Sequence, residues 1–147
     1  MPNYSIKSPE NKEEWDSYLL FRWEVLRKPL GMSKDSLADS IEDESFHLMG
    51  IDEEKNVIAS GRVHFNSKNE AQIRYMAVDE NFKRKGVGTE IVKELENYAI
   101  SKGIVNMILN ARENAISFYL SLGYEGVGPC QSDTGIPHKT MKKSLVS

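Results

Sequence analysis

Two hydrophobic periodicities meet in the stretch Met76-Ala77-Val78-Asp79-Glu80-Asn81-Phe82-Lys83-Arg84-Lys85-Gly86-Val87-Gly88-Thr89. Before it, residues 71–78 alternate in the two-residue period of a β-strand. After it, apolar side chains recur from Val87 to Ala99 in the period of a helix, which Gly103 is expected to end. The stretch therefore predicts a tight strand-to-helix turn.

This turn combines three features that favour a phosphate-binding site. The start of a helix exposes unpaired backbone N–H groups and the positive end of the helix dipole. Gly86 and Gly88 have no Cβ, so an anion can approach the backbone closely, and residues 83–85 add positive charge. The turn lacks the Gly-Lys-Ser/Thr of a Walker turn, and Ile91 stands where a dinucleotide-binding turn has its third glycine. A solvated basic loop with a glycine cap is the alternative interpretation.

The residues before the turn predict an antiparallel meander. Three apolar segments are separated by polar turns: Phe46–Ile51, Val57–Phe65 and Ala71–Val78. In the third segment, Ile73, Tyr75 and Ala77 alternate with Gln72, Arg74 and Met76, so the two sets should face opposite sides of the sheet.

The N-terminal third predicts a short strand over residues 3–7, followed by a helix. Ser8-Pro9-Glu10 fits a helix start, with serine as the cap and proline at the first helical position. Pro29 and Gly31 end that helix. The polar residues 34–44 leave a short helix and a loop as open alternatives.

The residues after the turn predict a strand, a helix and two further strands. The segments are Ile104–Leu109, Asn114–Leu122 ended by Gly123, Tyr124–Val127 and His138–Lys142, with a loop over Gly128–Pro137. The order of these elements predicts an α/β fold of the mixed α+β kind. In this fold a central mixed sheet begins with an N-terminal antiparallel meander and is flanked by helices. We expect one domain over residues 1–147.

Composition and charge limit the classes of function. With 39% hydrophobic and 28% charged residues, the chain is expected to fold around a core. A net charge of -3 gives no sign of nucleic-acid binding, and no apolar run is long enough to span a bilayer. The one cysteine, Cys130, and the absence of an apolar N-terminal segment favour the cytoplasm. The three histidines lack metal-ligand spacing, so we expect no metal site.

Two segments of the sequence resemble the GCN5-related N-acetyltransferase (GNAT) family. The signature of this family, Arg/Gln-x-x-Gly-x-Gly/Ala, lies between a strand and a helix. Residues 83–88 match it, except that Lys83 stands where Arg or Gln is usual, so the charge is kept without the planar fork of arginine. A second family segment is matched by residues 114–124, from Asn114-Ala115 through Phe118-Tyr119 to Leu122-Gly123-Tyr124. The early Val25-Leu26-Arg27 and the late Gly135-Ile136-Pro137-His138 resemble the bacterial ElaA-like subgroup.

The resemblance implies acetyl-coenzyme A as co-substrate and assigns candidate residues. The cofactor should lie where the third meander strand and the following strand splay apart. The backbone of Met76, Ala77 and Val78 should hold the pantetheine arm and polarise the thioester. The pyrophosphate should lie on the turn formed by Lys83, Arg84, Lys85, Gly86, Val87, Gly88 and Thr89. Asn114 should contact the cofactor, and Tyr119 should lie near its sulfur as the general acid, whereas helical spacing alone favours a packing role for Tyr119.

The implied activity is transfer of an acetyl group to a primary amine by direct attack. A non-catalytic acyl-coenzyme A sensor or regulatory module is the alternative. The acceptor, a small-molecule or protein amine, the acyl-chain preference and the choice between a monomer and a homodimer stay open at this level.

Several other polar residues are candidates for the acceptor side of the site. The general base is left open among His64, His138 and water. Arg62 or Arg74 is a candidate for binding an acceptor carboxylate, with the solvated face of the sheet as the simpler alternative. The acid run Glu42-Asp43-Glu44 is expected to be a solvated surface.

Overall fold

The chain is built around one sheet of seven strands. The computed structural model describes residues 3–37, 39–130 and 136–146 of the chain. The strands, in chain order, are β1 (Tyr4–Lys7), β2 (Phe46–Asp52), β3 (Val57–Phe65), β4 (Glu70–Val78), β5 (Asn106–Arg112), β6 (Glu125–Cys130) and β7 (His138–Ser144). Their order in the sheet is β1-β2-β3-β4-β5-β7-β6, and only the β4–β5 pair is parallel. The expected mixed sheet with an antiparallel meander is confirmed.

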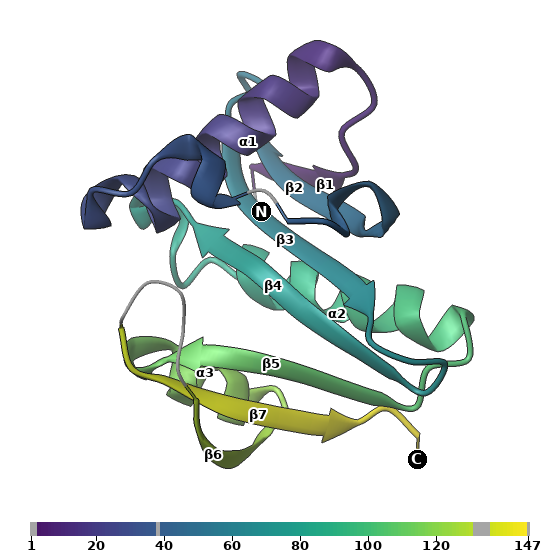
Figure 1. Cartoon of the computed structure of the whole chain (residues 1–147). Helices are drawn as coiled ribbons and strands as arrows, with labels where there is room; N and C mark the ends of the chain where they lie inside the picture. Colours follow the sequence, from purple (N-terminus) through teal and green to yellow (C-terminus); the bar gives the residue numbers. More distant parts are fainter. Residues whose placement is uncertain (1–2, 38, 131–135, 147) are drawn as a thin grey trace.

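Helices cover both faces of this sheet (Figure 1). The helix α1 (Lys12–Leu26) contacts β3 and β4 on one face, which we call the α1 face. The helix α2 (Val87–Ser101) contacts β2, β3 and β4 on the opposite face, and α3 (Ile116–Ser121) contacts β5 there. Short 3₁₀ turns join these elements: η1 (Lys28–Leu30), η2 (Lys34–Leu37), η3 (Glu42–Glu44), η4 (Glu80–Phe82) and η5 (Glu113–Ala115).

The main core lies between α2 and the sheet. The side chains of α2 at positions 87, 91, 92, 95 and 99 are all at most 1% exposed, as the helical period predicts. They pack against alternate residues of the central strands, among them Ile73, Met107 and Leu109. This packing fixes the start of α2 against the end of β4, which positions the turn between them.

Two predicted boundaries were wrong for local reasons. The first helix starts at Lys12, because the Asn11 side chain accepts the backbone N–H of Glu14 at 2.8 Å and so caps it. The Ser8 hydroxyl instead donates to the His47 carbonyl at 2.7 Å. The predicted loop Gly128–Pro137 also starts too early, since β6 continues to Cys130 by pairing with β7; residues 131–135 of it lie outside the described part.

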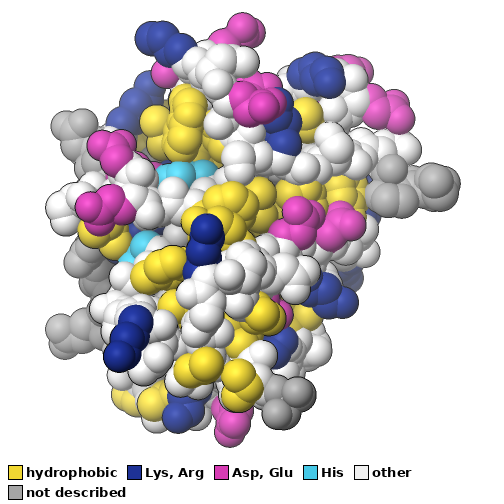
Figure 2. Space-filling view, turned by 90° about the vertical axis from the view of Figure 1, so that its right-hand side faces the viewer, with side chains coloured by type: hydrophobic (Ala, Val, Ile, Leu, Met, Phe, Trp, Pro, Cys, Tyr) yellow, Lys and Arg dark blue, Asp and Glu magenta, His cyan; other side chains and the backbone are white. Residues whose placement is uncertain are grey.

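An apolar surface lies at the end of the sheet where β3 turns into β4. Figure 2 shows hydrophobic side chains gathered in a band across this end, with charged side chains on both sides of it. Phe65, which closes β3, is 44% exposed, and its ring lies 6.1 Å from that of Tyr98. This surface is at the opposite end from the place where β4 and β5 separate (Figure 1).

Candidate active site

The strands β4 and β5 are paired for only half of their length. Their parallel register runs from Glu70 opposite Asn106 to Ile73 opposite Leu109 and stops there. Beyond this point the carboxyl ends of the two strands diverge (Figure 1). We call this opening the splay. It leaves backbone N–H and C=O groups at the end of β4 without a β5 partner, and such carboxyl ends are where open sheets bind ligands.

A β-bulge lies on the β3 side of the same segment. Ser60 pairs with Ala77 but Arg62 pairs with Arg74, so the single residue between them on β3 faces two residues of β4. One of these, Tyr75, has a positive φ of 57°, and its carbonyl accepts the Ser60 hydroxyl at 2.7 Å. The bulge therefore bends β4 at the splay and holds the bend with a side-chain hydrogen bond.

The bulge overturns the predicted alternation of β4. Tyr75 does not share a face with Ile73, because the guanidinium of Arg22 from α1 lies 3.9 Å from the centre of the Tyr75 ring. Met76 instead packs with the core on the α2 side, as Ile73 does. One extra residue in β4 thus places Arg74 and Tyr75 on the α1 face together, which strict alternation cannot do.

The turn before α2 has the backbone of an anion site. Arg84 has φ 65° and Gly86 has φ 91°, and Gly86 caps α2 without any side-chain hydrogen bond. The N–H groups of residues 87–89 therefore have no intrahelical carbonyl and no capping side chain. Lys83 lies 3.0 Å from Glu80 in an exposed ion pair, and residues 84–86 are exposed.

Gly88 has a packing role that the sequence did not predict. It is buried, and a Cβ added to it would lie 3.3 Å from Val78 and 3.4 Å from the Phe118 ring. The missing side chain thus lets α3 pack against the first turn of α2. A ligand at this position would meet the backbone N–H of Gly88 rather than space left by its side chain.

Tyr119 is buried in the core next to this contact. It is 6% exposed, and its ring lies 5.8 Å from that of Tyr124. The Tyr124 hydroxyl donates to Glu96 at 2.8 Å, whereas no hydrogen bond joins the Tyr119 hydroxyl to any residue of the described ranges. Burial raises the pKa of Tyr119, so the phenol keeps its proton at neutral pH.

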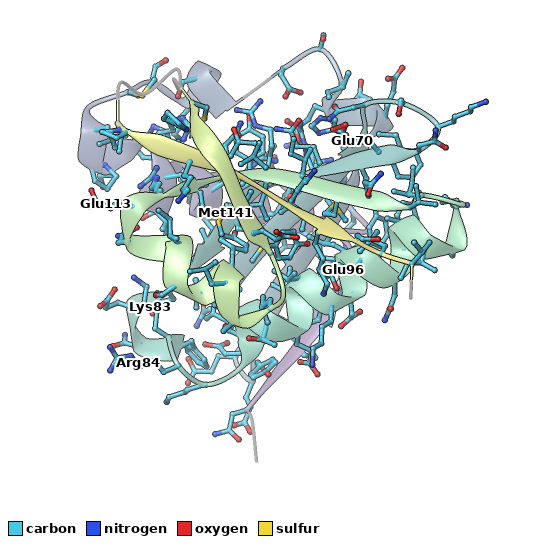
Figure 3. The ribbon with its side chains drawn as sticks, turned by 90° about the horizontal axis from the view of Figure 1, so that it is seen from below. Glu70, Lys83, Arg84, Glu96, Glu113 and Met141 are labelled. Atoms are coloured by element: carbon cyan, nitrogen blue, oxygen red, sulfur yellow. The ribbon has the colours of Figure 1, made fainter. Side chains whose placement is uncertain are left out.

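The candidate residues thus gather at one end of the molecule. Figure 3 shows Lys83, Arg84 and Glu113, which begins η5, at the same end, with Glu70 at the opposite end. Asn114 follows in η5 and is exposed. The end of β4, the turn and the start of α3, which are distant in sequence, therefore lie around the splay.

A buried ionic network occupies the α1 face beside the splay. Arg62, fully buried, binds Asp39 through two contacts of 2.9 Å. Arg22, also fully buried, lies 2.7 Å from Glu42. Burial alone would raise the pKa of Asp39, but hydrogen bonds and charge from Arg62 outweigh it and lower the pKa.

Two expectations are corrected by this network. Glu42 is not part of a solvated acid run, because its carboxylate pairs with Arg22 and lies 3.3 Å from Arg62. Arg62 is engaged by these two acids and is not on a solvated face. Arg74, one-third exposed and 3.5 Å from Asp39, is the more accessible of the two arginines.

His47 and His64 are held as neutral rings. The Nδ1 of His64 faces Arg62, which can only donate, at 3.1 Å, so Nε2–H donates to the Asn66 amide oxygen at 3.1 Å. His47 Nε2 donates to the Glu42 carbonyl at 2.9 Å, and Nδ1 accepts the Tyr18 hydroxyl at 2.8 Å. Burial lowers the pKa of both, and for His64 the Arg62 charge adds to the effect.

These pKa shifts predict that the fold loses stability as the pH falls from 7.5 to 5.5. The unfolded chain protonates its histidines near pH 6.5, whereas the folded protein does so only at lower pH. Below pH 6.5 the unfolded state therefore binds more protons, and the free energy of unfolding decreases by up to about 1.4 kcal/mol per pH unit for each histidine. Urea titrations across this range should show a shallower pH slope in the double variant His47→Gln, His64→Gln. An unchanged slope would mean that other groups cause the acid sensitivity.

His138 is arranged differently from His64. Its Nδ1 donates to the Ile136 carbonyl at 2.7 Å, so in the neutral ring Nε2 is the acceptor nitrogen. His138 lies opposite Arg112 in the β5–β7 ladder, and paired residues share a face of the sheet. His64 has both ring nitrogens engaged, so His138 is the better placed of the two to accept a proton.

Three residues at the splay, Arg27, Tyr75 and Arg112, were not predicted from the sequence as site residues. Arg27 and Arg112 both donate to the Leu26 carbonyl, at 3.3 and 3.1 Å, and so connect the end of β5 to the end of α1. Tyr75 is surrounded by arginines because of the bulge. The sequence gives no signal for the bulge, whereas the place of Arg112 after an apolar strand could have marked it as a strand-end residue.

The described residues contain no cluster of metal-binding side chains. No helix among them is long and apolar enough to cross a membrane.

Comparisons with known proteins identify the family of this chain. Residues 24–145 match the acetyltransferase (GNAT) domain family. YjcF, an uncharacterized N-acetyltransferase of Bacillus subtilis (strain 168), is 32% identical over 135 residues, covering 91% of this chain and 95% of the relative.

Solved structures share the fold at low identity. Escherichia coli ElaA is similar with a TM-score of 0.77 at 16% identity, covering 97% of this chain and 99% of ElaA. An aminoglycoside 6'-N-acetyltransferase complexed with coenzyme A gives a TM-score of 0.77 at 16% identity, with 97% and 98% of the two chains covered. At such identities the similarity shows the fold.

Proposed function

The chain belongs to the GNAT acetyltransferase family and is an acetyl-coenzyme A-dependent N-acetyltransferase, and from this we propose that it acetylates a primary amine by direct attack at the splay between β4 and β5. The observation that supports this site best is the divergence of β4 from β5 directly beside the uncapped start of α2. An extended thioester arm and a pyrophosphate need these two features next to each other.

Acetyl-coenzyme A would be held mainly by backbone groups. The pyrophosphate would accept hydrogen bonds from the N–H groups between Arg84 and Thr89, with Lys83, Arg84 and Lys85 supplying positive charge. The pantetheine arm would pair with the β4 edge at residues 76–78, which β5 leaves unpaired. Asn114, exposed at the start of η5, would bind the arm from the α3 side.

The transfer step would use few side chains. A neutral amine attacks the thioester carbon, and backbone N–H groups after the bulge stabilise the oxyanion of the tetrahedral intermediate. As the intermediate collapses, the C–S bond breaks and Tyr119 donates its proton to the leaving thiolate. The attacking nitrogen loses its proton to water or to Nε2 of His138.

The same site could bind acetyl-coenzyme A without turnover, as a sensor or regulatory module. A thiol-release assay over a panel of primary amines separates the two. An enzyme releases free coenzyme A in step with N-acetylated amine seen by mass spectrometry. A protein that binds coenzyme A in a calorimetric titration, yet releases no thiol with any amine, would contradict the proposed transfer.

A further inference from the structure

A cluster of arginines bridges the splay on the α1 face. The guanidinium groups of Arg22, Arg27, Arg62 and Arg74 lie 3.9, 5.8, 4.9 and 4.8 Å from the centre of the Tyr75 ring. Arg112, from the end of β5, meets Arg27 at the Leu26 carbonyl. The chain of contacts from Arg74 through Tyr75 and Arg27 to Arg112 therefore crosses from β4 to β5.

Carboxylates reach the members of this cluster unequally. Asp39 and Glu42 contact Arg22, Arg62 and Arg74, whereas no carboxylate of the described residues contacts Arg112. Asp39 is bound bidentately by Arg62, so Arg74 reaches it only at 3.5 Å. Glu113, the next residue after Arg112, is exposed, and no ion pair joins the two in the described ranges.

Arg112 is the clearest case of an uncompensated cation. It is partly buried, its guanidinium donates to the neutral Leu26 carbonyl, and burial lowers its pKa with no opposing carboxylate in the described part of the chain. A partly buried charge of this kind is costly unless a partner reaches it. Guanidinium groups also match the geometry of carboxylates and phosphates, which they can bind through two parallel hydrogen bonds.

We infer that the acceptor is a primary amine that also carries an anionic group, a carboxylate or a phosphate, and that Arg74 and Arg112 bind this group on the α1 face of the splay. The inference rests on the proposed function, because it assigns the acceptor side of the same site. Arg22 and Arg62, fixed by Glu42 and Asp39, hold the Tyr75 ring and add positive potential behind the anion. The amine would then extend from this anchor toward the bulge of β4.

Matched acceptors test the inference by activity. The pairs are β-alanine with β-alaninamide, and phosphoethanolamine with ethanolamine, so that each pair differs mainly in the anion. We expect kcat/KM to be at least tenfold higher for the anionic member of one pair, and the pair concerned tells a carboxylate from a phosphate. In Arg74→Gln and Arg112→Gln this ratio should fall toward one while KM for acetyl-coenzyme A stays within twofold. Arg74→Lys should recover only part of the ratio, because it restores the charge without the fork.

Lys68→Gln is the matched control, since it removes one exposed positive charge at the β3–β4 turn, far from the splay. It should keep the parental ratio. Equal rates for both members of both pairs, or a ratio that the two arginine variants leave unchanged, would overturn the inference.

A binding measurement separates this inference from the proposed function. With coenzyme A saturating, so that the pyrophosphate turn is filled, inorganic phosphate or succinate should raise the unfolding temperature of the parent protein and of Lys68→Gln. Arg74→Gln and Arg112→Gln should need at least tenfold more anion for the same shift. This result supports the anion site even if no amine is acetylated. Stabilisation that is absent, or equal in all four proteins, counts against the site even if acetylation is observed.

Discussion

Tyr119→Phe is expected to lower kcat by about 100-fold, the low end of the range for loss of a general acid. The leaving group is a thiolate, and protonating it stabilises the products of the collapse. A phenol carries its proton throughout the neutral range, and burial raises the pKa of this one further, so the proton is present when the thiolate leaves. The affinity for coenzyme A should change little, because only the hydroxyl is lost. Pre-steady-state thiol release, under conditions where chemistry limits the rate, measures the effect.

Tyr124→Phe is the matched control for this variant. The two rings are 5.8 Å apart, but the Tyr124 hydroxyl donates to Glu96, whereas the Tyr119 hydroxyl has no partner in the described residues. Tyr124→Phe should therefore lower the free energy of unfolding by about 1 kcal/mol and keep kcat. Tyr119→Phe should lower kcat and leave the free energy of unfolding nearly unchanged. Parental kcat in Tyr119→Phe would make Tyr119 a packing residue and leave water as the acid.

Gly86→Val is expected to weaken coenzyme A binding at least tenfold, or about 1.4 kcal/mol. Gly86 has φ 91°, a conformation that a β-branched residue avoids. Apart from the Tyr4 hydroxyl at 3.8 Å, a Cβ here would meet open space. The fold should therefore tolerate the change, while the strain moves the N–H groups at the start of α2 away from the pyrophosphate. Calorimetric titration with coenzyme A gives the affinity directly.

Gly103→Val tests whether strain alone explains the result. Gly103 lies just beyond the opposite end of α2, has φ 84° and has nothing within 4 Å of an added Cβ. Both variants should lose a similar amount of stability, and only Gly86→Val should lose affinity. Equal affinity in the two variants would remove the pyrophosphate from this turn.

The sequence predicted the elements well where periodicity decides them. β3 and α2 were predicted with close bounds, since long apolar patterns and the glycine at position 103 mark them. The helix start was three residues off, because Ser8 and Asn11 both have side chains that can cap a helix and only tertiary contacts decide between them. The bulge at Tyr75 was missed, because nothing local predicts a tyrosine at positive φ.

The same difference between local patterns and contacts of distant segments applies to the candidate site. The turn and the α3 segment are local motifs, so the sequence could place them, and the fold brings them together at the splay. The arginine network could not be predicted, because it joins α1, β3, β4 and β5 across large sequence separations. A buried Arg62 and an exposed one look alike in the sequence, and only the pairing with Asp39 tells them apart.

A crystal structure of the complex with coenzyme A tests the central claim most directly. The account predicts the pyrophosphate on the N–H groups between Arg84 and Thr89, the pantetheine arm along residues 76–78 in the splay, and the sulfur within reach of the Tyr119 hydroxyl. Coenzyme A bound outside the splay, or in the splay with its pyrophosphate away from the start of α2, would contradict the account.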